Sequence, residues 1–424
     1  MTMFGLADCN NFYCSCERVF NPALRTAPVV VLSNNDGCII ARSNEAKALG
    51  IDMGAPFYKM RDYLERNKVA VFSSNYTLYG DMSRRVMMLL SDFAPDVSQY
   101  SIDEAFINLT GFGQGDTLRS YGKQIVTAIG RGTGIPVTLG IAPTKTLAKV
   151  AAHYGKHYRG YDGTCLIDTE DKRVKALKGL DVADVWGIGR HTAQKLEYHG
   201  IHTAWDFIRR SESWVRRLLT VTGVRTWREL QGESCISIDE LPQKKSICTS
   251  RSFPDNGISR LAQLEEALAH FAAACSRKLK EQHSCCRAVT VFAYTSRFRA
   301  DAPSSLINRT VSLPVPTNDL RELISTTMAA LRSQWSHAAT YFYKKAGVIV
   351  TDICPDNAIQ PDLFDPVDRD KQARLAAAID ALNRKNGYDT VKTAIQLTDN
   401  SWRMKHEHES KRYTTNLDDV IIVR

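Results

Sequence analysis

Hydrophobic and polar positions follow two different periods over the first 165 residues. Apolar runs of strand length occur in FGLAD, PVVVLSN, VAVFSSN, IDEAFINL, PVTLGIA and GTCLID. Between the later runs, apolar residues recur at helical spacing in 76–93 and 117–130, which predicts two amphipathic helices. Strands interleaved with helices indicate an α/β or α+β domain. The order strand, helix, strand, strand, helix, strand fits a ferredoxin-like core.

The pattern changes twice further along the chain. Short helices are predicted after residue 170, where GIG precedes an amphipathic stretch. From about 243 the strand patterns CRAVTVFAY, TVSLPVP and KAGVIVTDI accompany two long helical patterns, which predicts a separate α+β domain. The stretch at 235–247 contains Pro and Lys and has the composition of a linker, and the chain beyond 355 is polar.

The composition is that of a globular protein with several cores. Its 424 residues are 44% hydrophobic and 24% charged, so two to four domains are expected. The formal net charge of +9 suits a polyanionic partner without requiring one. No secretory signal is read, no apolar run approaches the ~20 residues that span a bilayer, and the scattered cysteines form no CxxC pair. We therefore expect a cytoplasmic protein with reduced thiols, no structural zinc and no membrane partner.

Two adjacent acids interrupt the apolar strand pattern IDEAFINL. Asp103 and Glu104 would point to opposite faces of a strand, so one of them would face a core. Asp8 ends the first predicted strand, and pairing of the two strands would bring three carboxylates together. Burying them unpaired is costly, whereas Mg²⁺ binds carboxylate and phosphate oxygens. The acids therefore suggest a two-metal site for phosphoryl transfer, and a surface hairpin with solvated acids is the alternative.

Several segments are similar to motifs of a known family. DCNNFYCSCE, PVVVLSNNDGCIIARSNEAKALGI, YSIDEAF and GIAPTKTLAKVAA resemble Y-family translesion DNA polymerases, and NNDGCIIAR with the final KRYTT resembles the UmuC branch of that family. The resemblance implies a multidomain α+β right hand. Its expected parts are a ferredoxin-like palm at 1–23 and 71–165, small fingers at 24–70, a helical thumb with a helix-hairpin-helix at 170–234, an α+β little finger at 243–354, and a C-terminal tail at 355–424.

The resemblance implies a template-directed, error-prone DNA polymerase that performs translesion synthesis in the SOS response by two-metal nucleotidyl transfer. Asp8, Asp103 and Glu104 would be the catalytic residues. They would hold two Mg²⁺ ions, with Mn²⁺ as a substitute, and the Cys9 carbonyl would assist as a further metal ligand. A nucleotidyl-cyclase-like palm enzyme and a non-catalytic DNA-binding scaffold stay open as alternatives.

The resemblance also assigns contacts to the incoming nucleotide. Tyr13 matches the family's steric gate, an aromatic ring that excludes a ribose 2′-hydroxyl. The fingers depart from the common pattern, because Asn44 and Lys47 stand where many members have a tyrosine and an arginine, and an ammonium cannot make the bidentate contact of a guanidinium. The nucleotide-binding residues that the resemblance implies are Phe12, Tyr13, Arg42, Asn44, Lys47 and Lys149.

Contacts to primer-template DNA are expected in two regions. VWGIG at 185–189 resembles a helix-hairpin-helix, whose glycines let backbone amides approach a phosphate. Basic residues among strand aromatics after 243 fit tracking of the DNA backbone. A plain turn and a solvated basic face are the alternatives. The predicted DNA-binding residues are Gly187, Ile188, Gly189, Lys244, Lys245, Arg251 and Arg297.

Protein partners are expected toward the C-terminus. QPDLF at 360–364 resembles the peptide by which bacterial polymerases bind the sliding β-clamp, with Gln360, Leu363 and Phe364 as its contact residues. By resemblance, the tail would engage a UmuD′-like dimer, and full activity would need a RecA filament. With DNA and dNTP as substrates, the expected location is the cytoplasm, in association with the nucleoid.

Overall fold

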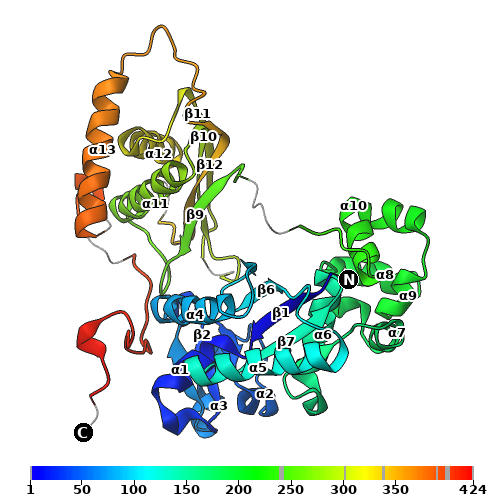
Figure 1. Cartoon of the computed structure of the whole chain (residues 1–424). Coiled ribbons are helices and arrows are strands. Elements are labelled where there is room, and N and C mark those ends of the chain that lie inside the picture. Colours follow the sequence, from blue (N-terminus) through cyan, green and yellow to red (C-terminus); the bar gives the residue numbers. More distant parts are fainter. Residues whose placement is uncertain are drawn as a thin grey trace. The chain divides into compact units, whose positions relative to one another are not determined.

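The computed structural model describes residues 2–237, 243–299, 302–336, 340–387, 390–396 and 402–422. The chain divides into two compact units, one formed by Met1–Leu241 together with Glu407–Arg424 and the other by Pro242–His406 (Figure 1). The C-terminal residues thus return to the first unit. The linker expected at 235–247 lies partly outside the described residues.

The first unit is built around a five-stranded sheet with the order β5-β6-β1-β7-β8. Its central strand β1 is antiparallel to both neighbours, β6 and β7, and β8 runs parallel to β7. The order of the first four strands is that of a ferredoxin-like core, as the sequence pattern predicts. The strands are β1 (Phe4–Cys9), β5 (Val97–Gln99), β6 (Glu104–Asn108), β7 (Val137–Ala142) and β8 (Thr164–Leu166).

Helices cover both faces of this sheet. One core contains alternate strand residues such as Ala7 and Ala105 together with residues of the helices α1, α4 and α5. The other core contains Leu6 and Phe106 together with residues of α6 and of the helices that follow it. The strand period of two therefore separates two buried faces. The helices are α1 (Phe12–Phe20), α4 (Tyr76–Ser91), α5 (Gly115–Thr133) and α6 (Lys145–His157).

A small three-stranded sheet, with the order β3-β2-β4, forms a separate core in the predicted fingers. β2 is fully buried and pairs antiparallel with β3 and parallel with β4, so β4 is an edge strand. Two short helices, α2 and α3, complete this region. The elements are β2 (Val29–Leu32), β3 (Ile39–Arg42), α2 (Asn44–Ala48), α3 (Phe57–Arg66) and β4 (Ala70–Ser73).

Short helices follow α6, as expected from the change of pattern after residue 170, except that α10 spans 19 residues and is interrupted by non-helical backbone at Thr220. They share a core with the α6 face of the main sheet. The buried Glu229 carboxylate accepts a hydrogen bond from the Thr146 amide at the start of α6 (2.9 Å), which joins the last of these helices to α6. The helices are α7 (Glu170–Lys178), α8 (Arg190–Tyr198), α9 (Ala204–Ile208) and α10 (Glu212–Leu230).

The second unit contains a four-stranded antiparallel sheet with the order β11-β10-β12-β9. Alternate residues of its strands pack against α11 and α12, which confirms the predicted α+β composition. A further helix, α13, follows the strands. The elements are β9 (Ile247–Ser252), α11 (Leu261–Glu281), β10 (Ser284–Thr295), β11 (Leu306–Thr317), α12 (Leu320–Gln334), β12 (Tyr343–Pro355) and α13 (Arg369–Asn386).

Periodicity missed the strands β3, β5 and β9, which have four, three and six residues. The strand predicted over IDEAFINL begins only at Glu104, and Asp103 lies in the bend before it. The expectation that the two acids point to opposite faces of one strand is therefore wrong. The boundaries among the predicted palm, fingers, thumb and little finger stay predictions.

Candidate active site

Two of the predicted catalytic acids face each other across the centre of the main sheet. Asp8, the second-last residue of β1, is paired directly with Glu104 at the start of β6. Both side chains are mostly buried, with 13% and 19% of their surface exposed. Like charges at directly opposed positions destabilise a sheet, so this pair requires compensating positive charge.

Asp103 lies beside the same strand end. Its carbonyl oxygen accepts a hydrogen bond from the Cys9 amide (2.9 Å), and its carboxylate accepts one from the Ser101 hydroxyl (2.5 Å). The Cys9 thiol is buried in the core on the other face of the sheet, and burial raises its pKa above the usual range. Only the backbone carbonyl of Cys9 is therefore suited to the assisting role predicted for this residue.

Two lysines of α6 supply the compensating charge. The Lys156 ammonium lies 2.5 Å from an Asp8 carboxylate oxygen, and the Lys149 ammonium lies 3.0 Å from both oxygens of Glu104. The lysines are seven residues apart and so share one face of the helix. At Gly140 of β7, a Cβ atom would overlap the backbone of α6. Glycine thus lets α6 lie directly on the sheet, with its lysines at the acids.

The charges of this cluster do not balance. Burial raises the pKa of Asp8 to about 6, the Lys156 ammonium opposes that rise, and the carboxylates of Glu104 and Asp103 add to it. Three carboxylates thus interact with two ammonium groups. Hard oxygen donors with an excess of negative charge suit a divalent cation such as Mg²⁺, so the donor set fits the predicted metal.

The side chains are nevertheless turned to their protein partners. Within the described residues, no three His, Cys, Asp or Glu side chains are grouped closely enough to hold a metal ion. Asp8 and Glu104 point to the lysines, and Asp103 to Ser101. Sequence reasoning selected Lys149 but missed Lys156. The spacing of seven residues on one predicted helix was the available signal.

The predicted sugar gate lies at the start of α1. Tyr13 is half-buried and stacks on Tyr79 of α4, with ring centroids 4.6 Å apart and planes 18° apart. Burial raises the pKa of Tyr13 to about 12, and the nearby charge of Asp103 contributes to the rise. The Tyr13 hydroxyl is therefore neutral and close to the acids. Phe12 is only 3% exposed and belongs to the core, where its ring packs 5.8 Å from Tyr13.

Asn11 connects the predicted fingers to this site. Its backbone is left-handed, with φ of 47°, which asparagine adopts more readily than most residues. Its side chain donates to Asn44 (3.0 Å) and accepts from the Lys47 ammonium (2.7 Å). Sequence reasoning did not select Asn11, although it precedes the aromatic pair.

Positive charge gathers at the same place. Burial lowers the pKa of Lys47, and the charges of Arg42 and Lys156 lower it further. The Arg42 guanidinium donates to the Ile51 carbonyl (2.5 Å). Lys47 of α2 is thus close enough to Arg42 of β3 and Lys156 of α6 to be repelled by both.

Known proteins with this sequence pattern identify the family. The sequence model of the impB/mucB/samB family matches residues 7–153, and that of its C-terminal domain matches 244–363. The chain is 42% identical to Protein ImpB and 41% identical to Protein UmuC, both of Salmonella typhimurium, and each match covers 100% of both chains. The chain belongs to the impB/mucB/samB family.

More distant members and a solved structure agree with this assignment. A DNA polymerase IV of Brucella melitensis is 27% identical over 91% of this chain and 83% of its own. A Y-family DNA polymerase chimera has the same fold, with a TM-score of 0.66 at 20% identity over 83% of this chain and 99% of its own. The predicted family and fold class are therefore confirmed: the chain is a UmuC-like Y-family polymerase. Residues 373–423 match a domain of unknown function.

The predicted helix-hairpin-helix contacts residues beside Glu104. Gly187 has φ of +89°, which favours glycine, and Gly189 precedes the first turn of α8. The Ile188 side chain is buried, so only its backbone is available to a phosphate. Trp186 donates to the Tyr100 hydroxyl (3.1 Å), and the Lys149 ammonium lies 4.6 Å from the centre of the Tyr100 ring and 5.4 Å from that of Trp186.

In the second unit, the described helices α11 and α12 pack on the face of the sheet opposite Phe292 and Tyr294. These two rings stack on each other, and Gly347 leaves room for the Phe292 ring. Arg251 pairs with Ala346 in the register, so it lies on the same face as the helices, where its guanidinium contacts the Met404 sulfur (3.1 Å). The structure therefore does not place Arg251 with the aromatic residues. Lys244, Lys245 and Arg297 are exposed.

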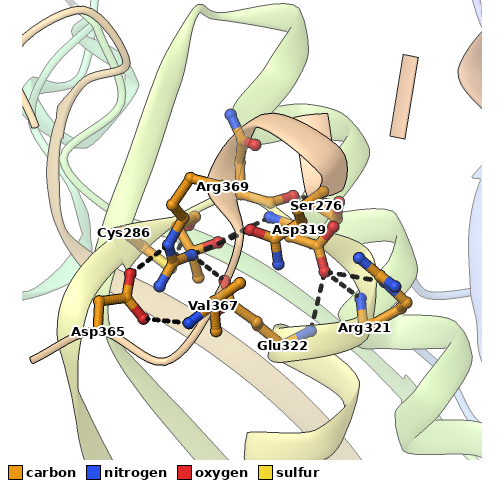
Figure 2. Close-up of polar contacts among 11 residues, drawn as sticks. Ser276, Cys286, Asp319, Arg321, Glu322, Asp365, Val367 and Arg369 are labelled. Carbon is orange, nitrogen blue, oxygen red and sulfur yellow. Dashed lines mark hydrogen bonds and ion pairs between the residues drawn. The ribbon is translucent and has the colours of Figure 1, made fainter. Parts of the chain in front are cut away.

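The predicted clamp peptide is exposed and anchored at its C-terminal side. The side chains of Leu363 and Phe364 are 91% and 86% exposed, and Gln360 is exposed as well. Figure 2 shows Arg369, the first residue of α13, between Asp365 and Glu322. The Arg369 nitrogens lie 2.5 Å and 2.9 Å from these carboxylates.

Among the helices that the structure describes, none combines the length and apolar character required to cross a bilayer.

Proposed function

We propose that this chain performs error-prone, template-directed DNA synthesis across damaged bases in the SOS response, by two-metal nucleotidyl transfer. One observation carries the proposal, namely that Asp8 lies beside the neighbouring acids Asp103 and Glu104 at the end of the two central strands, although Asp8 is distant from both in sequence. Primer-template DNA and dNTP are the substrates of this family of polymerases.

The metals would be two Mg²⁺ ions, with Mn²⁺ as a substitute. Polymerases of the Y family depend on divalent metals. Asp8, Asp103, Glu104 and the Cys9 carbonyl would hold them, and bound metals neutralise phosphate charge and activate the attacking hydroxyl. In this structure the ammonium groups of Lys156 and Lys149 form ion pairs with Asp8 and Glu104. Because both cations can turn to phosphate oxygens instead, they would exchange their carboxylate partners for the triphosphate.

The nucleotide would lie between the acids and the predicted fingers. Repulsion of Lys47 by Arg42 and by Lys156 supports a polyanion site, because a triphosphate would relieve it. Asn44 and Lys47, held by Asn11, would face that triphosphate. Tyr13 would exclude the 2′-hydroxyl. The buried Phe12 ring would support the Tyr13 ring from the core side.

DNA would be bound through its backbone, without base specificity. The Gly187–Gly189 turn would offer backbone amides to a phosphate, with Ile188 fixing the turn from the core. Lys244, Lys245 and Arg297 would add charge in the second unit. The stacked rings of Phe292 and Tyr294 would add an uncharged contact on the same unit.

Protein partners are part of the proposal. Two highly exposed apolar side chains in a polar stretch suit a docking peptide, so Gln360, Leu363 and Phe364 would bind a sliding β-clamp. The C-terminal tail would engage a UmuD′-like dimer, and a RecA filament would complete the active assembly. Such a substrate would locate the enzyme in the cytoplasm, at the nucleoid.

Primer extension tests this function directly. The full chain would be given Mg²⁺, four dNTPs and a primed template, either intact or with one abasic site, with and without UmuD′ and RecA. We expect extension past the abasic site, strongest with the partners. A cyclic nucleotide product would instead select the cyclase alternative, and DNA binding without any extension would select the scaffold.

A further inference from the structure

The residues 407–416, here called the C-terminal strap, run along the first unit (the red end of the chain in Figure 1). The Glu407 amide donates to Asp36 (2.9 Å). The His408 carbonyl accepts from the amide of Ser73, the last residue of β4 (3.0 Å), and the His408 amide donates to the Ser73 hydroxyl (2.9 Å). The strap is thus bound at the end of the edge strand β4, where Ser73 is fully buried.

Ser410 of the strap connects two helices. The Asn75 side chain, at the N-terminus of α4, donates to the Ser410 carbonyl (3.0 Å) and lies 3.1 Å from its hydroxyl. The Ser410 hydroxyl donates to the carboxylate of Glu17 on α1 (3.0 Å). One serine therefore bridges α1 and α4.

The same two helices carry the sugar gate. Tyr13 and Glu17 are four residues apart on α1, and Asn75 and Tyr79 are four residues apart along the start of α4, so each pair lies on one side of its helix. The Tyr79 hydroxyl donates to Glu17 (2.6 Å), and the Tyr79 ring stacks on Tyr13. The contacts run without a break from Ser410 through Glu17 and Tyr79 to the gate.

We propose that the C-terminal strap positions the sugar gate, with Ser410 and Glu17 holding Tyr79 against Tyr13. The proposal deepens the proposed polymerase function and depends on the gate role of Tyr13. It gives a role to the end of the segment that matches a domain of unknown function. Glu17, Tyr79 and Ser410 are positioning residues, since none of them needs to contact the nucleotide.

The burial of Glu17 makes the bridge sensitive to each donor. Glu17 is 2% exposed, and a buried acceptor that loses a donor is destabilised by more than an average hydrogen bond contributes. Burial raises the pKa of Glu17 to about 7, the Tyr79 and Ser410 donors oppose the rise, and Glu409 adds to it. Without the Ser410 hydroxyl, the Glu17 carboxylate accepts a hydrogen bond from Tyr79 alone. The Glu17 side chain is then held less firmly, and the Tyr79 ring bonded to it can shift.

The test measures sugar selectivity, the ratio of kcat/KM for a dNTP to that for the matching rNTP, in the full chain. The ratio is independent of the fraction of active enzyme, so a loss of stability alone does not change it. Ser410→Ala and Tyr79→Phe should each lower it about three- to tenfold, which corresponds to about one hydrogen bond. Glu17→Gln should keep it within about twofold, because an amide oxygen can accept from both donors.

Two further variants make the outcome decisive. Lys411→Ala changes the neighbouring exposed side chain and should leave both extension and selectivity unchanged. Tyr13→Ala should collapse selectivity. If Tyr13→Ala has no effect, the gate assignment fails and the strap proposal fails with it. If Tyr13→Ala collapses selectivity while Ser410→Ala and Tyr79→Phe match the unmodified chain, the gate stands and the strap proposal alone is overturned.

Discussion

The main sheet of the first unit and the sheet of the second unit are built alike but carry different kinds of side chain. Both are largely antiparallel with helices packed on them. The first holds Asp8 and Glu104 inside the structure, under α6. The second packs its described helices α11 and α12 on one face, and Phe292 and Tyr294 stack on the other. One sheet therefore concentrates charge, and the other presents stacked aromatic rings.

The difference follows from what each surface would bind. A reacting phosphate needs carboxylates and ammonium groups at fixed positions, and charges act most strongly where water is excluded. A DNA backbone is long and uniform, so many weak contacts suffice. Single substitutions should therefore have large effects around Asp8 and graded effects in the second unit.

The largest effect is expected at the acids. Asp103→Asn should retain primer-template binding but lower extension by about a hundred- to thousandfold, because one charged oxygen of the metal site is lost. Extension is read on gels and binding by fluorescence anisotropy. Asp96→Asn, at an exposed acid near the same sheet, is the matched control and should extend normally. Normal extension by Asp103→Asn would remove that residue from the site.

The buried Glu17 carboxyl should make the free energy of unfolding depend on pH. Because burial raises the pKa of Glu17 to about 7, the folded chain keeps a proton between about pH 4.5 and 7 that the unfolded chain releases. The free energy of unfolding should fall across this window by about 2–3 kcal/mol relative to Glu17→Gln. Urea unfolding of both proteins at pH 5 and pH 8 measures this difference. Parallel pH profiles would show that Glu17 titrates normally.

A smaller effect is expected at Lys156. Lys156→Ala should raise the KM for dNTP about tenfold, as expected when one charged contact to a phosphate is lost. Steady-state extension kinetics separate KM from kcat. Lys123→Ala, which removes an exposed ion pair with Asp162, is the control. An unchanged KM would leave Lys156 as a structural partner of Asp8 only.

The smallest effect should occur in the second unit. Arg297→Ala should weaken DNA binding about two- to fivefold and lower the slope of log K against log salt by about 0.9, the value for one phosphate contact. Titrations at several salt concentrations give the slope. The same titration of Arg251→Ala compares the two faces of the sheet. A loss at Arg251 equal to that at Arg297 would contradict the division of the faces.

Much of the fold could be predicted from local patterns. The long helical patterns that became α4, α11 and α12 lie within about two residues of the observed helices, because one buried face repeats at the helical period. The apolar runs gave β1, β7 and β10. Strands as short as β5 offered too few positions for a period.

The candidate site was only partly predictable. The motifs selected Asp8, Asp103 and Glu104, and the pairing of β1 with β6 brings the first and last of them together. The motifs gave no partner for either carboxylate. Lys156 meets Asp8 because Gly140 lets α6 lie close to the sheet, a contact between elements that no local pattern encodes.

The sequence by itself determined most of the strands and long helices and the family motifs that they carry, since burial of one face imposes a period on neighbouring residues. Only the tertiary structure decided which charges meet and where the polar C-terminus goes. The strap contacts the first unit through backbone groups and a few side chains such as Ser410. Contacts of this kind leave no hydrophobic period, so its association with Glu17 could be found only in the folded chain.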